Sequence, residues 1–151
     1  MTEQDNQFML HALTLADKAE AAGEVTVGAV IVYENKIIGE GWNQPIQNHD
    51  PSAHAEIMAL RAAAENLGNY RLNDCDIYVT LEPCMMCAGA IVHARIKRLV
   101  FGAYDPKTGV AGSVDNCFIK PFINHQVAIT DGILESECSQ KLKNFFKTRR
   151  A

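Results

Sequence analysis

His54-Ala55-Glu56 and, further along the chain, Pro83-Cys84-Met85-Met86-Cys87 are the segments from which both the fold and the function of this sequence can be inferred. One histidine and two cysteines are good ligands for a zinc ion. Three protein ligands leave the fourth tetrahedral position open, and this distinguishes a catalytic zinc from a structural one. The two segments therefore predict a metal site made by His54, Cys84 and Cys87.

Each segment also carries a signal for the start of a helix. Pro51 precedes the first segment and suits the first position of a helix, with Asp50 or Ser52 as the capping residue. Pro83 has the same position ahead of Cys84. Both halves of the site would then present the positive end of a helix dipole to the ion, which helps to hold the cysteines as thiolates.

Glu56 follows the predicted histidine ligand by two positions and gives the site a possible reaction. Bound zinc lowers the pKa of its water from 15.7 to roughly 7, so hydroxide becomes available at neutral pH. A carboxylate that lies beside the ion without binding it can carry protons between that water and a substrate. The sequence therefore predicts a hydrolytic metal site with Glu56 as its proton carrier.

A thiol-redox pair is the alternative interpretation of Cys84 and Cys87, because Cys-x-x-Cys also occurs in redox proteins with alternating strands and helices. A single histidine at the start of a helix is also commonly structural. The redox interpretation leaves His54 and Glu56 without a function, so the two segments together favour a catalytic zinc.

Composition describes an ordinary globular protein. The 151 residues are 48% hydrophobic and 21% charged, which predicts one domain over residues 1–151 with a sizeable core. No apolar run approaches the roughly 20 residues of a membrane span, and the polar residues 1–5 do not resemble a secretory signal, so we expect a cytoplasmic protein without a membrane partner. The net charge of −4 argues against nonspecific coating of nucleic acid but allows a local basic patch.

Periodicity predicts strands that alternate with helices. The expected helices are 4–22, a zinc helix from about 51 to 67, a buried helix 84–94 and a final helix 134–149; the expected strands are 27–33, 37–43, 76–81, 98–102 and 126–130. This order predicts an α/β fold, a three-layer α/β/α sandwich around a mixed five-stranded sheet whose later strands are parallel. Ligands bind beyond the carboxyl ends of strands in such sheets, and both metal segments lie there.

From Glu24 to Arg150 the sequence resembles the bacterial tRNA-specific adenosine deaminases of the cytidine-deaminase-like superfamily. His-x-Glu followed by Pro-Cys-x-x-Cys is the signature of zinc deaminases that act on nucleobases, and it identifies only the superfamily. The narrower resemblance rests on the whole set of matching segments. These are Val27-Gly28-Ala29-Val30, Gly39-Glu40-Gly41-Trp42-Asn43, His54-Ala55-Glu56-Ile57, residues 81–90, Phe101-Gly102, Lys107-Thr108-Gly109, Asn124-His125 and Phe145-Phe146.

The resemblance implies a cytidine-deaminase-like fold, one Zn²⁺ per subunit on His54, Cys84 and Cys87, and a homodimer that needs no other cofactor. It implies conversion of adenosine to inosine at the wobble position of a tRNA, with the anticodon stem-loop as partner. In that reaction the metal-bound hydroxide attacks C6, Glu56 shuttles protons, and ammonia leaves.

The resemblance also suggests substrate contacts. Asn43 is expected to fix the purine, and Val27, Ala55 and Asp105 are further candidates, although a surface turn explains Asp105 equally well. Thr26 stands where the family usually has proline, which puts the rigidity of the loop near the flipped base in question.

The end of the chain is basic and aromatic. Phe145 and Phe146 lie among cations that include Arg149 and Arg150, and such residues can stack on bases and contact phosphates. Helix packing with a solvated charged face explains the same pattern. With the resemblance, we expect one phenylalanine to pack inward and the other, with the arginines, to contact RNA.

Two other functions remain open. A zinc deaminase of free guanine, cytosine or a nucleoside would carry the same metal motif. A noncatalytic RNA-binding subunit with a structural zinc is the second, and Glu56 argues against it because a structural site does not need that carboxylate.

Overall fold

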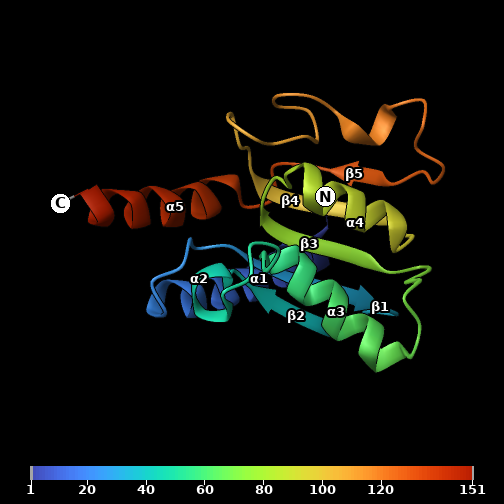
Figure 1. The fold of residues 1–151 in the computed structure, drawn as a ribbon, viewed down its shortest axis with the longest axis horizontal. Coiled ribbons are helices and arrows are strands. Elements are labelled where there is room, and N and C mark those ends of the chain that lie inside the picture. Colours follow the sequence, from blue (N-terminus) through green and yellow to red (C-terminus); the bar gives the residue numbers. More distant parts are fainter. Residues whose placement is uncertain (1, 151) are drawn as a thin grey trace.

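The computed structural model describes residues 2–150 of the chain. Its sheet has five strands in the order β2-β1-β3-β4-β5 (Figure 1). The strands are β1 (Gly28–Tyr33), β2 (Lys36–Trp42), β3 (Asp76–Leu81), β4 (Arg98–Ala103) and β5 (Ala128–Thr130). The helices are α1 (Glu3–Ala21), α2 (Pro45–Asn48), α3 (Ala55–Leu67), α4 (Met85–His93), the 3₁₀ helix η1 (Cys117–Ile119) and α5 (Glu135–Arg150).

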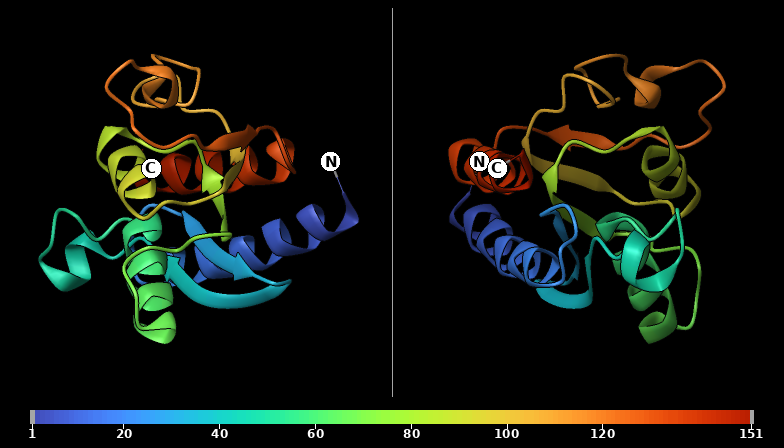
Figure 2. Two further views of the ribbon diagram at one scale, coloured as in Figure 1. Left: turned by 90° about the vertical axis from the view of Figure 1, so that its right-hand side faces the viewer. Right: turned by 60° about the vertical axis from the view of Figure 1, so that its left-hand side comes forward.

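The sheet lies between two helical layers, which confirms the predicted three-layer α/β/α sandwich. Helices α1 and α5 cover one face and α3 and α4 cover the other (Figure 2). The last turns of α5 project beyond the sheet (Figure 1). No helix in the described part of the chain combines the length and the hydrophobicity that crossing a membrane requires.

Strand directions follow from the connections. Strand β1 is antiparallel to both β2 and β3, whereas β3, β4 and β5 are parallel to one another, as predicted. The β1–β2 hairpin turns through Glu34 and Asn35, whose φ angles of 50° and 62° match the tight turn that the twist of a hairpin favours. Helix α4 makes the crossover from β3 to β4, so the carboxyl end of β3 leads directly into Pro83 and Cys84.

Each strand has one side facing each helical layer, because side chains alternate along a strand. In β1, Ala29 and Ile31 belong to the core under α3 and α4, and Val30 and Val32 belong to the core under α1. Gly41 in β2 lets α3 approach closely, since a Cβ there would lie 2.3 Å from the carbonyl oxygen of Ala55. This close contact fixes the start of α3, where the first metal segment lies.

Two helices differ from the prediction. Helix α3 begins at Ala55, with His54 as its N-cap residue, so Pro51 does not start it. Asp50 instead accepts hydrogen bonds from Ser52 in the preceding turn. Helix α4 is buried on one side only, and Met85 is 74% exposed, so the predicted fully buried helix is wrong there.

Helix α1 and the ends of the sheet add local detail. The buried stripe of α1 includes Met9 and Leu13, whereas Leu10 faces outward. Between β2 and α3 lies the one-turn helix α2, which ends at His49 in the left-handed conformation. Strand β5 spans three residues, fewer than predicted.

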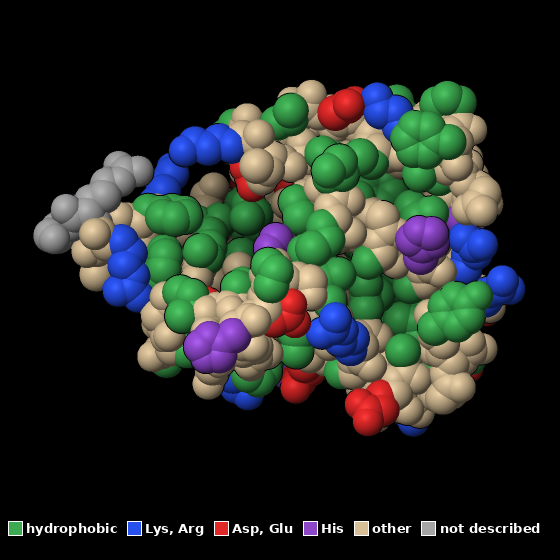
Figure 3. Space-filling model, in the orientation of Figure 1, with side chains coloured by type: hydrophobic (Ala, Val, Ile, Leu, Met, Phe, Trp, Pro, Cys, Tyr) green, Lys and Arg blue, Asp and Glu red, His purple; other side chains and the backbone are tan. Residues whose placement is uncertain are grey.

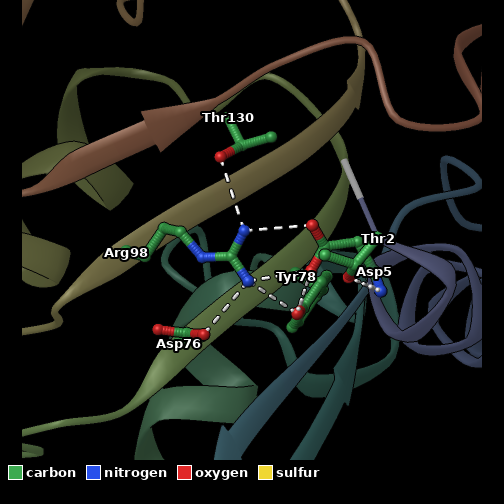
Figure 4. A network of polar contacts seen from close by, with 6 residues as sticks. All are labelled: Thr2, Asp5, Asp76, Tyr78, Arg98 and Thr130. Atoms are coloured by element: carbon green, nitrogen blue, oxygen red, sulfur yellow. Dashed lines mark hydrogen bonds and ion pairs between the residues drawn. The ribbon is translucent and has the colours of Figure 1, made fainter.

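A partly buried ion pair joins the start of α1 to the amino ends of β3 and β4 (Figure 4). Arg98 donates to both oxygens of Asp5, at 2.8 and 3.1 Å, and to Asp76 at 3.2 Å. The Tyr78 hydroxyl also donates to Asp5, at 2.6 Å. The hydrogen bond from Arg98 is the main cause that lowers the pKa of Asp5 from 3.8 to about 2, against the opposing effect of burial.

We expect Asp5→Asn to lower the free energy of unfolding by about 2 kcal/mol at pH 7, because a carboxylate pKa depressed from 3.8 to about 2 stabilises the folded state by that order. The folded-state pKa is the lower one, so the stabilisation is present above pH 3.8 and is lost as the pH falls toward 2. Urea unfolding of both proteins at pH 7 and near pH 3 measures it. A difference between them that stays constant across this range would contradict the assignment.

Candidate metal centre and active site

The three predicted metal ligands meet beyond the carboxyl end of β3, although two of them lie far from the third in sequence. His54 is the N-cap of α3, Cys84 is the N-cap of α4, and Cys87 lies in the first turn of α4. His54 Nδ1 is 3.6 Å from Cys84 Sγ and 3.5 Å from Cys87 Sγ. The ligand atoms of all three residues lie within 4.8 Å of one another.

These distances fit a tetrahedral zinc ion. Zinc–sulfur bonds of about 2.3 Å and zinc–nitrogen bonds of about 2.0–2.1 Å at the tetrahedral angle separate the two ligand atoms by about 3.6 Å. The separations of 3.5 and 3.6 Å therefore leave the right space for the ion between the side chains. The metal-ligand cluster found among residues 2–150 has these three members, so a bound ion would keep one position for a ligand from outside the chain.

The electrostatics of the cluster also suit a cation. The Cys87 thiol and the His54 ring beside it lower the pKa of the Cys84 thiol to about 4. The same contact with Cys84 raises the pKa of His54, and the pKa of Cys87 is raised as well. The cluster thus keeps thiolate character on Cys84, and thiolate is the form of cysteine that binds metal.

Glu56 is buried in the first turn of α3, next to the ligand cluster. Burial raises the pKa of its carboxyl to about 7. A carboxyl group that changes protonation near neutral pH can both accept and donate a proton during a reaction, because its pKa is matched to the working pH. The position and the chemistry of Glu56 therefore agree with the role of proton carrier rather than metal ligand.

Asn43 ties the end of β2 to the start of α3. Its side-chain oxygen accepts a hydrogen bond from the backbone N–H of Ala55, at 2.8 Å, and so satisfies one of the donors at the helix start. The backbone N–H of Asn43 donates to the carbonyl of Val27, at 3.1 Å. The structure thus brings together the predicted substrate contacts Val27, Asn43 and Ala55, of which Val27 and Ala55 are buried. Because the oxygen of the Asn43 amide is engaged, its Nδ2 group is the end that can face a ligand.

A groove of about 790 Å³ lies between α5 and the segment that follows β4. One wall carries Tyr104, Asp105 and Lys107; the other carries Leu142, Lys143 and Phe146. Figure 3 shows the hollow between the projecting C-terminal helix and the body of the protein, with hydrophobic side chains inside and Lys and Arg side chains around it. Leu81, at the end of β3, also lines the groove, which therefore begins close to the metal segment.

The two phenylalanines of α5 face different ways. Phe145 is 7% exposed and carries the Arg149 guanidinium 4.8 Å above its ring, whereas Phe146 is 43% exposed and lines the groove. Phe145 therefore packs against the protein, and Phe146 is the phenylalanine whose ring is open to a ligand. Arg150 ends α5, but its side chain lies outside the described residues.

Thr26, the departure from the family pattern, connects the loop before β1 to α5. Its hydroxyl donates to the carbonyl of Lys141, at 3.3 Å, and its side chain is buried. Lys141 in turn pairs with Asp17 of α1, at 2.5 Å. The hydrogen bond from Thr26 restrains the loop at the position where a proline would restrict the backbone through its ring.

Sequence reasoning named Asp105 and Phe146 as substrate contacts, and both line the groove, but it missed Tyr104 and Leu142. Ser139, Leu142, Lys143 and Phe146 of α5 lie at the spacing of one helix face, and this spacing was the available signal. Tyr104, on the opposite wall, donates a hydrogen bond to Asp131, at 2.5 Å. The contact raises the pKa of its hydroxyl to about 12. Nothing in the residues near Tyr104 indicates that they lie opposite α5.

Comparison with known proteins agrees with this site. The family described as the cytidine and deoxycytidylate deaminase zinc-binding region matches residues 2–103, which include all three metal ligands and Glu56. A tRNA-specific adenosine deaminase from Haemophilus influenzae is 59% identical over 150 residues, covering 99% of this chain and 87% of the relative.

Solved structures show the same fold. One, from studies of A-to-I editing by tRNA:A34 deaminases at the wobble position of transfer RNA, is similar with a TM-score of 0.88 and 44% identity, covering 90% of this chain and 99% of the other. A guanine deaminase from Bacillus subtilis is similar with a TM-score of 0.65 and 36% identity, covering 100% of this chain and 96% of the other.

Proposed function

Because the chain belongs to the tRNA-specific adenosine deaminase family, we propose that it hydrolyses adenosine to inosine at the wobble position of a tRNA anticodon, with one Zn²⁺ as its cofactor. The observation that carries the proposal is the meeting of His54, Cys84 and Cys87 around a space for one ion, with Glu56 buried beside them.

The chemistry requires a nucleophile and a proton carrier. His54, Cys84 and Cys87 would hold the zinc ion, which would lower the pKa of a water to about 7 and so provide the nucleophile at neutral pH. Glu56 accepts a proton from the attacking water and delivers it to N1 of the purine. The water oxygen adds to C6, and the proton of the new C6 hydroxyl then passes through Glu56 to the amino group. The C6–N bond breaks, ammonia leaves, and the C6 carbonyl of inosine remains.

Asn43 is proposed to orient the base. Its oxygen is engaged by the N–H of Ala55, so its Nδ2 group donates to an acceptor on the purine ring. The same hydrogen bond joins Asn43 to the helix that carries His54 and Glu56. A base held by Asn43 is therefore placed relative to the metal and the proton carrier by one rigid unit.

The groove supports an RNA substrate. Lys107, Lys143 and Lys147 give it positive charge, and Phe146 offers an exposed ring. Stacking of a base on an aromatic side chain contributes about 1–3 kcal/mol, and cations contact the phosphates. An anticodon loop is single-stranded, so extruding its base avoids most of the cost of opening a duplex. We infer that Asp105, Arg149 and Arg150 also contact the RNA. The proposed tRNA substrate further implies a cytoplasmic location.

The nearest alternative is deamination of free guanine, because the guanine deaminase from Bacillus subtilis shares 36% identity with this chain. The higher identity of 59% to the Haemophilus influenzae protein and the open, basic groove favour the RNA substrate. A free base needs an enclosed pocket and gains nothing from cations that extend along a groove.

A competition between substrates tests the proposal. The purified chain should form inosine in an unmodified tRNA or an anticodon stem-loop, and its activity on free adenosine, guanine and cytidine should be lower by at least about a thousandfold, because binding energy from the remote parts of the RNA is used at the reacting atom. Glu56→Ala should keep its zinc and lose turnover, whereas Asp115→Asn, on an exposed loop, should change neither. A preference for any free base, or inosine formation by Glu56→Ala, would contradict the proposal.

We also infer that the protein is a homodimer. Met85 on α4 is 74% exposed. Ile119, the last residue of η1, and Phe122, shortly after it, are 77% and 79% exposed, and η1 packs against α4. Exposed apolar side chains grouped on one face are typical of an interface. Met85 directly follows Cys84, so we place the contact between the two copies next to the metal segment.

Sedimentation at micromolar concentration tests the dimer. The wild-type chain should sediment as a dimer, and Phe122→Glu should shift it toward the monomer, because a charge buried in the interface lacks a partner. Leu10→Glu is the matched control, since Leu10 is exposed on α1, in the opposite helical layer. A monomeric wild-type protein would contradict the inference.

A further inference from the structure

Glu82 is a buried carboxylate to which the reaction assigns no role. It is 2% exposed and lies between the end of β3 and the Pro83-Cys84 pair that supplies a metal ligand. Burial of a charged group is costly unless hydrogen bonds compensate for the lost water. The partners of Glu82 therefore show what the group does.

All side-chain partners of Glu82 come from the segment 105–113, which follows β4. The N–H of Asp105 donates to Oε1, at 3.0 Å, and the Ser113 hydroxyl donates to the same oxygen. The N–H groups of Ala111 and Ser113 donate to Oε2, at 2.8 and 3.0 Å. Oε1 thus joins the two ends of the loop, at Asp105 and Ser113, and Oε2 holds the Ala111–Ser113 end alone. A single carboxylate therefore ties both ends of the loop to the end of β3.

Gly109 shows how closely the loop wraps around the carboxylate. A Cβ at this position would lie 2.4 Å from Cδ of Glu82 and 2.6 Å from the carbonyl oxygen of Asp105. Neither position can move freely, because one is a buried carboxylate and the other is backbone. A backbone hydrogen bond from Val110 to the carbonyl of Pro83, at 3.0 Å, adds a further tie to the metal segment.

The outer side of the same loop forms a wall of the groove. Asp105, Pro106, Lys107 and Thr108 line it. The Asp105 carboxylate accepts from the N–H groups of Lys107 and Thr108, at 3.0 and 3.1 Å, which fixes the turn locally. Glu82 holds the start of that turn through the Asp105 N–H, so it sets the position of residues 105–108 relative to Cys84.

We propose that Glu82 is a positioning residue that holds the 105–113 segment as a preformed wall of the RNA groove, in fixed relation to the metal-binding end of β3. The proposal rests on the proposed tRNA deaminase function. A preformed wall lowers the cost of binding, because a loop that is ordered in only a fraction of molecules weakens the apparent affinity by that fraction. Glu82 touches neither the metal ligands' side chains nor the reacting atoms in this account, so it acts on binding more than on chemistry.

Steady-state kinetics on an anticodon stem-loop test the proposal. In Glu82→Gln an NH₂ group replaces one acceptor and faces backbone donors, so the loop loses part of its anchor. We expect KM to rise about tenfold with kcat within about twofold, the signature of lost binding rather than lost transition-state stabilisation. Gly109→Ala leaves Glu82 intact but pushes a methyl group against it, and should give the same pattern. Asp115→Asn, a carboxylate change on the neighbouring exposed loop, is the control and should leave both constants unchanged.

Hydrogen exchange on the free protein gives a readout that needs no substrate. The amides of Asp105, Ala111 and Ser113 should exchange at least about tenfold faster in Glu82→Gln than in the wild type, with zinc content unchanged. If the wild type does not deaminate tRNA, the proposed function fails while the exchange experiment still decides the anchoring role. Unchanged exchange at these amides, or a fall in kcat with KM unchanged in both variants, would overturn the proposal. Should Glu82→Gln not fold, Gly109→Ala carries the same comparison.

Discussion

The active site depends on the approach of two helix starts, α3 and α4, to one point beyond the edge of the sheet. His54 and Cys84 are the N-cap residues of these helices, and their side chains come within 3.6 Å of each other. Such an approach concentrates helix-dipole charge and partly buried thiols in a small volume. The positive helix ends stabilise the thiolates. A zinc ion binds the two thiolates and the imidazole together and keeps one open position for a ligand.

The rest of the fold holds the two helix starts in place. Gly41 allows α3 to lie directly on β2, and Asn43 joins the end of that strand to the first N–H of the helix. At the second helix start, β3 runs parallel to β4, and a short connection leads from Leu81 to the start of α4 at Met85. Glu82 then connects the same strand end to the wall of the groove. The three metal-ligating residues, Glu56 and the groove are therefore positioned by the ends of β2 and β3.

Much of this arrangement could be predicted from the sequence, because its signals are local. Asp76–Leu81 is a strand with the predicted bounds, since alternation and β-branched residues identify it without tertiary information. The metal ligands could be named because their residue types and spacing serve one chemistry. The start of α3 was placed too early, because Pro51 resembles a first helical residue, and only the turn closed by Asp50 and Ser52 shows otherwise.

Other features depend on contacts that a linear pattern does not contain. Periodicity cannot show that the apolar Met85 faces outward, since an apolar surface helix and a buried helix have the same composition. The groove exists because α5 lies across the segment after β4, and no local signal sets that distance. The role of Glu82 requires knowledge of its partners more than twenty residues away.

X-ray absorption at the zinc edge of the purified protein is the most direct measurement of the central claim, that two distant segments hold one ion with an open position beside Glu56. The account predicts about one zinc per chain, with two sulfur ligands at about 2.3 Å and two light-atom ligands at about 2.0–2.1 Å, one of which is displaced by a substrate analogue. A zinc with four sulfur or other protein ligands, or a chain that contains a disulfide between Cys84 and Cys87 and no metal, would contradict it.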